Sequence, residues 1–476
     1  MKRFAILAIM AAFILGTVAM ASAVELKARG AWRAHANWTD NLNYQDADNT
    51  DGDGQSEDDF NVQERARVWF DFIANENVKA VLGLEIGNFR WGQPGAGDLS
   101  TDNTGIIKVK HAYLDFNLPE TQINVKAGLQ RVALPSAFGS NIFDGDVAAL
   151  VTTVPVNEMV SVVTGWARPY DRFDGENNSR NDETDIAFLV VPVKLDGVAL
   201  NPFFAYAWIG KDSYLPANKE DWVYSNIGFD FDSNGAANGS LTDDATAWWA
   251  GLNFKVTMFD PIVIDGDINY GRVDGEVNVG GGDKEDLEIS GWFFDLAASY
   301  KMDMMTPQVF FVYSTGLDDD SLDSGDKLKM NWFPVYYTES FAPTTFGFAG
   351  SSFTYDNQIG AYASGLWAVG FALRDIKLVD KLSHEFIVMY ARGTNDKNCI
   401  KELSLSADTL TEKDSLWEVD FNTKYQMYEN LAAIVELGYI KANYDEDVKV
   451  DATDKRGDNF ADEAAWKLSV GVTYNF

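Results

Sequence analysis

The sequence predicts an all-β fold, a transmembrane antiparallel β-barrel, and three observations support this prediction. Apolar and polar residues alternate along most of the chain, in segments of about ten residues that suit strands with one lipid face and one water face. The connections between these segments are alternately short and long. The longest charge-free run after the N-terminus, 357–373, is interrupted by polar residues and three glycines. Because only helices and closed barrels cross lipid, a membrane-spanning reading of this chain requires a barrel.

The N-terminus predicts a cleaved Sec-type signal peptide, residues 1–23. Lys2 and Arg3 form a basic start, residues 4–18 are apolar, and Ala21-Ser22-Ala23 fits the cleavage site. We therefore expect an exported mature chain, 24–476, that forms a single barrel. An uncleaved anchor is the alternative, and the short apolar run disfavours it. The formal net charge is −34, and loss of the two basic residues makes it −36.

Alternation is clearest in the first strand and near the C-terminus. In the first strand, one face carries Val24, Leu26, Ala28, Gly30, Trp32, Ala34, Ala36 and Trp38. The other face carries Glu25, Lys27, Arg29, Arg33, His35 and Asn37. A period of two places these sets on opposite faces of one strand, so the apolar set is expected to face lipid.

The connections set the expected number of strands. Short turns are expected near 75–77, 119–120, 155–157, 196–197, 260–261, 302–306, 374–379 and 429–430. Long extracellular loops are expected near 39–60, 91–104, 132–146, 171–183, 211–244, 276–286, 317–356, 395–414 and 446–463. Eight turns and nine loops give 18 strands with both termini on the periplasmic side. The region 300–380 leaves 16 strands as an alternative.

Three of the long loops are strongly acidic. They contain the stretches 46–59, 174–183 and 318–326. Carboxylate clusters suit Ca²⁺ or Mg²⁺, which would bridge the loops to anionic outer-leaflet lipid, whereas a solvated charged surface is the simpler interpretation. We expect no other cofactor.

The C-terminal strand ends on an aromatic residue with no polar tail. Its apolar face consists of Trp466, Leu468, Val470, Val472, Tyr474 and Phe476. This alternation with a final Phe resembles the signal that the outer-membrane barrel assembly machinery recognises. Together with the signal peptide, it predicts a bacterial outer membrane as the destination.

Basic residues fall on the polar face of the early strands and predict a cationic wall in the lumen. They are Arg29, Arg33, Arg65, Arg67 and Lys126. Lys108 and Lys110 join them if a β-bulge near His111 shifts the alternation. The alternative is that these charges are scattered wet-face residues without a shared role.

The segment 132–146 differs from the acidic loops because it is rich in Pro, Gly, Ser and small apolar residues. We expect this third loop to fold into the lumen and to carry Asp144 and Asp146 opposite the basic wall. A basic wall facing acidic residues would create a transverse field at the narrowest point of a pore, where selection takes place.

Four stretches resemble a known family. HAYLDFNLP (111–119), KAGLQRVALP (126–135), DGDVAALVTTVP (144–155) and VTGWARPYD (163–171) are similar to the outer membrane homotrimeric porins of anaerobic sulfate reducers. They resemble general diffusion porins more distantly. The resemblance implies a water-filled homotrimeric barrel with an inward third loop, and it adds Arg131 to the wall residues. General porins usually have 16 strands, so our count of 18 departs from them.

The resulting functional prediction is a porin for passive diffusion of small hydrophilic solutes and ions, with a mild anion preference. A substrate-selective porin for sugars or oligopeptides is the first alternative, because 331–348 carries seven aromatic residues. We expect that cluster to pack on its own loop or on a neighbouring subunit. A structural or adhesive protein with a closed lumen is the second alternative. The three dispersed histidines and the lack of catalytic motifs predict that the chain is not an enzyme.

Overall fold

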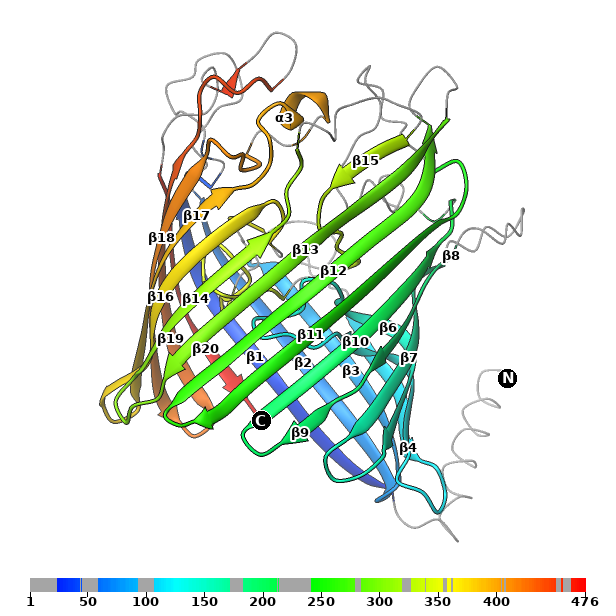
Figure 1. The fold of residues 1–476 in the computed structure, drawn as a ribbon. Coiled ribbons are helices and arrows are strands. Elements are labelled where there is room, and N and C mark those ends of the chain that lie inside the picture. The colour runs from blue at the N-terminus through cyan, green and yellow to red at the C-terminus, as the bar shows by residue number, and fades with distance from the viewer. Residues whose placement is uncertain are drawn as a thin grey trace, which may run out of the picture.

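A computed structural model of the chain describes most of the mature sequence. The described residues are 24–42, 44, 59–92, 107–171, 183–211, 213, 241–278, 284–318, 327–338, 340–353, 358–360, 363–403, 405, 408–450, 455–456 and 464–476. They form a closed antiparallel β-barrel of 18 strands (Figure 1). The first strand pairs with the second and with the last, which closes the sheet. The predicted fold class and the count of 18 are therefore confirmed. The signal peptide lies outside the described residues.

The strands follow one another around the barrel in chain order. They are β1 (Glu25–Asp40), β2 (Asp59–Asn75), β3 (Val78–Arg90), β4 (Lys108–Asn117), β5 (Asn124–Ala133), β6 (Asp144–Pro155), β7 (Ser161–Asp171), β8 (Glu183–Val190), β9 (Val193–Leu195), β10 (Val198–Ile209), β11 (Ala245–Phe259), β12 (Ile262–Asn278), β13 (Lys284–Tyr300), β14 (Thr306–Ser314), β15 (Lys327–Asn331), β16 (Leu366–Val379), β17 (Leu382–Gly393), β18 (Ser415–Tyr428), β19 (Leu431–Asn443) and β20 (Ala464–Asn475). β8 and β9 both pair with β10 and make one barrel strand. β15 pairs in parallel with β13 and belongs to a loop.

The connections at one end of the barrel are short turns, and most of those at the other end are longer loops (Figure 1). The loops, named L1 to L9, are 41–58, 91–107, 134–143, 172–182, 210–244, 279–283, 315–365, 394–414 and 444–463. One predicted turn is misplaced. Two irregularities in the β16–β17 pairing let β16 continue to Val379, so that turn lies at residues 380–381 rather than 374–379. The acidic loop stretches fall almost entirely outside the described residues.

The outer surface follows the predicted alternation. Trp32 is 47% exposed on the outside, whereas Arg33 is 9% exposed and faces the lumen. A chain of ring contacts runs around the outside of β10 to β14, through Phe204, Trp248, Tyr270, Trp292, Phe294 and Tyr313. Aromatic girdles of this kind mark the lipid–water boundary of outer-membrane barrels. Trp248 and Tyr313 lie near the loop end of their strands, whereas Tyr270 and Trp292 lie at the middle of the longer strands β12 and β13.

The inner surface is divided into two unlike halves. On β1, β2 and β4 the inward side chains are mostly polar, as predicted. On β8 to β14 they are mostly apolar and buried, namely Ile186, Phe188, Phe203, Ala205, Ala207, Ala247, Trp249, Val273, Phe293, Phe310 and Val312. An apolar lumen wall needs a cover, because exposed apolar area costs about 25 cal/mol per Å².

The described residues contain one α-helix, α3 (Cys399–Glu402), in L8. No helix among these residues is long and apolar enough to cross a membrane.

Candidate pore constriction

The tip of the β5–β6 hairpin leaves the barrel wall and enters the lumen. Pairing between β4 and β5 stops at Ala112 with Leu129, and pairing between β6 and β7 stops at Ala148 with Arg168. Residues 130–147, including L3, therefore leave the barrel wall: they pair within their own hairpin and, at Phe143, with Tyr337 of L7. The predicted constriction loop, 132–146, coincides with this segment, and its placement in the lumen is confirmed.

Gly128 lies next to the point where the hairpin departs. Its φ of +127° is a conformation that side chains disfavour. A Cβ at this position would lie 2.3 Å from the carbonyl oxygen of Ala112. The backbone bend therefore requires glycine at this position of the KAGLQ stretch.

L3 reaches the opposite wall of the barrel. The Ala137 N–H donates a 2.6 Å hydrogen bond to Asp267 of β12. The Asn141 side chain exchanges two 3.0 Å hydrogen bonds with the backbone of Ala363 in L7. L3 is thus anchored by hydrogen bonds to β12 on the far side of the lumen and to L7.

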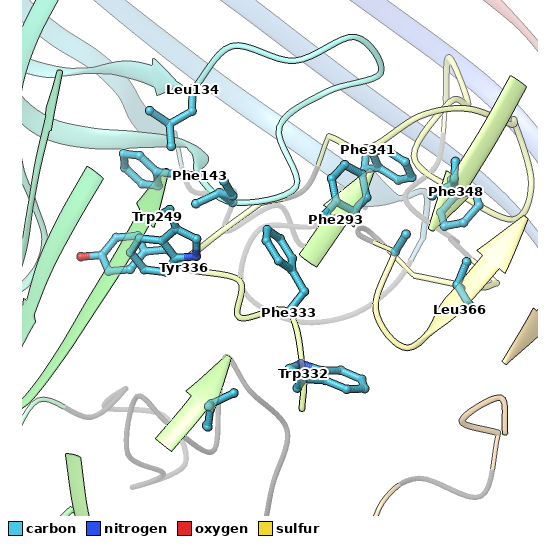
Figure 2. Packing of buried hydrophobic residues seen from close by; sticks show 14 of the residues in the cluster. Leu134, Phe143, Trp249, Phe293, Trp332, Phe333, Tyr336, Phe341, Phe348 and Leu366 are labelled. Atoms are coloured by element: carbon cyan, nitrogen blue, oxygen red, sulfur yellow. The ribbon is translucent and has the colours of Figure 1, made fainter. Parts of the chain in front are cut away.

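L7 also folds into the lumen and covers the apolar wall (Figure 2). Tyr336 lies edge-on to Phe143 of L3 and to Trp249 of β11, at centroid distances of 5.3 and 5.8 Å. Phe341 contacts Phe293 of β13 at 5.5 Å and Phe348 of its own loop at 5.3 Å. The aromatic cluster of 331–348 therefore packs partly on its own loop, as predicted, and partly on L3 and the barrel wall, which was not predicted.

A cavity of about 410 Å³ remains between L7 and the polar wall. We call it the charged cavity, and its lining is Arg67, Trp69, Lys110, His111, Arg131, Asp144, Gly145, Asp146, Tyr337, Ser340 and Ala349. It brings together five of the predicted residues, namely Arg67, Lys110 and Arg131 of the basic wall and the loop acids Asp144 and Asp146. Lys110 reaches it because the predicted β-bulge is present, between the pairs His111–Gly83 and Val109–Leu84.

Every cationic side chain of the charged cavity has an acidic neighbour. Arg131 makes a two-pronged contact with Asp144, with hydrogen bonds of 2.8 and 2.6 Å. Asp146 accepts from Lys110 and lies 3.0 Å from His111 Nε2. The arrangement differs from the expected one, since both acids begin β6 and lie beside the cations rather than across the pore.

Arg67 completes the pattern, because its Nε donates to Glu85 of β3. The lining therefore alternates in charge at close range. The prediction of a transverse field between a basic wall and an opposing acidic loop is therefore wrong. Each of the three cations, Arg67, Lys110 and Arg131, forms an ion pair with a carboxylate beside it. Such pairs across neighbouring strands cannot be predicted from the alternation within one strand.

The other predicted wall residues face the lumen at different levels. Arg29 pairs with Asp71 at 3.2 Å, and Arg33 donates to Ser352 O and to Asn88. Arg65 lies directly across from Arg33 in the strand register. Lys126 lies across from Asp115, and Lys108 from Glu85. None of these five residues lines the charged cavity.

A second cavity of about 260 Å³ lies on the other side of L7. Its polar lining comes from β16 to β19 and includes Arg374, His384, Glu385, Lys424 and Glu436. Sequence reasoning did not find this site. In the sequence, these residues occupy ordinary water-facing positions of their strands. They form a cavity only because L7 folds into the lumen beside them.

The role of L7 in the lumen was also missed, although a signal exists. The stretches FFAYAWI and AWWAG, at 203–209 and 247–251, are apolar on both faces. Strands buried on both faces read as continuous apolar runs. Such strands in a barrel indicate that something apolar packs against the inner wall. The described residues place no three His, Cys, Asp or Glu side chains together as metal ligands.

The fold and the inward loops define a class by architecture: a closed antiparallel β-barrel with two loops folded into its lumen. Comparison of the structure with solved structures agrees with this class. OpdL of Pseudomonas aeruginosa matches with a TM-score of 0.50 and 11% identity over 95% of this chain and 99% of that one. OpdQ of the same organism matches with a TM-score of 0.50 and 10% identity over 95% and 97%.

The outer membrane protein OprD of Pseudomonas aeruginosa has 13% identity over 96% of each chain, with a TM-score of 0.49. At identities of 10 and 11%, the likeness to OpdQ and OpdL shows the fold alone. No protein-family description matches the sequence, and no curated protein matches it.

Proposed function

We propose that this protein is an outer-membrane porin that gives small hydrophilic solutes and ions passive passage through the lumen. The observation that carries the proposal is the charged cavity, a polar compartment inside a closed barrel at the level where two loops fold inward. Polar residues facing the interior of a barrel are useful when water and solutes occupy it.

A substrate-selective channel is the second candidate, and L7 is the observation that favours it. Two loops rather than one narrow this lumen, and only Tyr337 among the seven aromatic residues of 331–348 is substantially exposed, at 44%. Its ring lies against Gly145 in the charged cavity. A narrow, ion-paired lining with one exposed ring suits recognition of a small solute better than bulk diffusion.

The ion pairs bear on the ion preference. Arg67, Lys110 and Arg131 are each offset by a carboxylate, so the charged cavity supplies little net field. Arg33 and Arg65 lie directly across from each other in the strand register of the same wall. We retain a mild anion preference as the proposal, smaller than a basic wall without these ion pairs would give.

The remaining assignments are proposals that follow from the sequence. They are export through the 1–23 signal, insertion by the barrel assembly machinery through the terminal Phe476, homotrimer formation, contact with outer-membrane lipid, and Ca²⁺ or Mg²⁺ at the acidic loops. In the structure, the Phe476 backbone exchanges hydrogen bonds of 2.8 and 3.0 Å with Gly30, so the last residue takes part in closing the barrel.

Planar-bilayer recording on the refolded mature protein tests the proposal. A stable ohmic conductance supports a porin, and concentration-dependent block by one sugar or peptide supports the selective candidate. A folded barrel that never conducts would show a closed lumen and would refute both.

A further inference from the structure

Two carboxyl groups face each other inside the lumen, on the wall where the tip of L3 is anchored. Asp267 of β12 and Asp295 of β13 are directly paired in the register of these neighbouring strands (Figure 1). The two residues are 1% and 3% exposed, and their carboxyl groups lie within hydrogen-bonding reach of each other. We propose that they hold a Ca²⁺ ion between them, at what we call the lumen cation site. This proposal does not depend on the channel function.

Most of the carboxylate oxygens at the lumen cation site lack a partner. Both oxygens of Asp295 and Oδ1 of Asp267 are buried, and none of the three accepts a hydrogen bond. The other oxygen of Asp267 accepts the 2.6 Å hydrogen bond from the Ala137 N–H of L3. A buried carboxylate is costly unless a positive charge or hydrogen-bond donors offset it. Two such carboxylates side by side therefore indicate a positively charged occupant.

The surrounding side chains do not supply that positive charge. Lys255 of β11 lies one inward position away in the strand register, and its ammonium is paired with Asp265 at 2.7 Å. Asn253, directly across from Asp267, is a neutral amide whose oxygen accepts a 2.9 Å hydrogen bond from Asn201. Within the described part of the chain, neither Asp267 nor the facing acid of β13 forms an ion pair. The charge must therefore come from outside the protein.

A neutral oxygen at the adjacent inward position also lacks a partner. Asn269 of β12 is 3% exposed, and its Oδ1 accepts no hydrogen bond. This oxygen lies over Gly251 of β11, where a Cβ would be only 2.0 Å from it. Gly251 therefore leaves room on the inner face for the amide. Because Asn269 carries no charge, its bare oxygen is evidence for a missing partner that is independent of the acid pair.

The ligand chemistry favours Ca²⁺ among the common cations. Carboxylate and amide oxygens are ligands of Ca²⁺, which accepts them in variable number and geometry. Mg²⁺ usually keeps several water molecules, and a site this buried has little room for them. The charge of a divalent ion also offsets two carboxylates. A proton shared between the carboxyl groups is the alternative occupant, and the experiment below separates the two.

A bound ion would also help to position L3. Asp267 receives the Ala137 N–H with one oxygen and offers the other to the lumen cation site. An ion held there would fix the orientation of this carboxylate and thereby the anchor of L3 on the far wall. The site differs from the acidic extracellular stretches, because its ligands lie inside the barrel.

The experiment measures the calcium content of the refolded protein. Wild type, Asp295→Asn and Asp267→Asn are refolded with Ca²⁺, desalted and analysed by elemental mass spectrometry, and heat-modifiable gel migration confirms that each is folded. Both substitutions keep the side-chain size, and an amide oxygen at position 267 can still accept from the Ala137 N–H. Asp115→Asn is the matched control, because Asp115 is a lumen carboxylate that already pairs with Lys79 at 3.3 Å.

We expect wild type and Asp115→Asn to retain one Ca²⁺ per chain more than either variant of the lumen cation site. Ca²⁺ at about 100 times its Kd should also raise the unfolding temperature of the wild type by about 3 °C. The rise should be smaller in Asp295→Asn and Asp267→Asn, which lack one of the two carboxylates.

Equal calcium contents in all four folded proteins would overturn the site, because ions held only at the acidic loops would give that result. A shared proton would be shown by equal contents together with a higher unfolding temperature of Asp295→Asn in calcium-free buffer. Calcium content is measured without conductance. A folded protein that never conducts would therefore refute the channel function and leave this test intact.

Discussion

Neutralising Asp146 should make the channel measurably more anion-selective. In the structure this carboxylate contacts Lys110 and lies 3.0 Å from His111 Nε2 in the charged cavity. The Asp146→Asn change keeps the side-chain size and leaves the Lys110 ammonium without its offsetting charge. A net positive charge then faces the solute path.

The magnitude follows from Coulomb's law. An ion about 8 Å from a unit charge in water changes its energy by about 0.5 kcal/mol. The sign is opposite for an anion and a cation, so their permeability ratio shifts by about 1 kcal/mol, which is roughly fivefold. Screening must be kept weak, and at about 10 mM salt the Debye length is roughly 30 Å.

The assay is the reversal potential across a bilayer in a dilute salt gradient. Asp447→Asn is the matched control, because it removes the same formal charge from L9. The Asp447 side chain is 86% exposed. The Lys455 ammonium beside it lowers the pKa of the Asp447 carboxyl below its ordinary value, so Asp447 is ionised at neutral pH. Equal shifts in the two variants, or none in Asp146→Asn, would refute the placement of the charged cavity on the ion path.

Three further predictions concern the architecture around the site. Gly128→Ala should strain the bend of the inward hairpin by about 1–3 kcal/mol, and added contact with Ala112 O should shift the hairpin, which single-channel recording will detect as an altered conductance. Arg456→Met leaves the fully buried Asp414 without its cation and should cost about 3–5 kcal/mol in local stability. We expect a protease to cleave L8 and L9 faster in this variant. A variant as resistant to the protease as the wild-type protein would contradict the prediction. Replacing Phe476 with Ala keeps its backbone hydrogen bonds to Gly30 but removes the ring that lies against Gly30. It should lower the yield of folded barrel on heat-modifiable gels, and an unchanged yield would contradict a role of the ring in assembly.

Several features of the barrel could be predicted because they are local in the sequence. Alternation with a period of two assigned Trp32 to the lipid face and Arg33 to the lumen, and the structure agrees. A break in the alternation near His111 predicted the β-bulge. The unusual composition of 132–146 predicted its inward position. Each of these signals depends only on neighbouring residues.

The site itself depends on residues that the sequence keeps far apart. Arg131 and Asp144 were predicted as opposing walls, but they pair because the hairpin folds both strands inward together. Glu418 binds L7 residues more than 70 positions earlier in the chain. No spacing rule connects such positions.

By itself, the sequence predicted a closed sheet of 18 strands with 16 as the alternative, the two distinct faces of its early and late strands, and the loop that turns inward. The tertiary structure alone decided which charges neutralise one another and that L7 divides the lumen. The physical reason is that strand alternation is set by the pleat of each strand, whereas contacts across the lumen arise only when closure of the barrel brings distant strands and loops face to face.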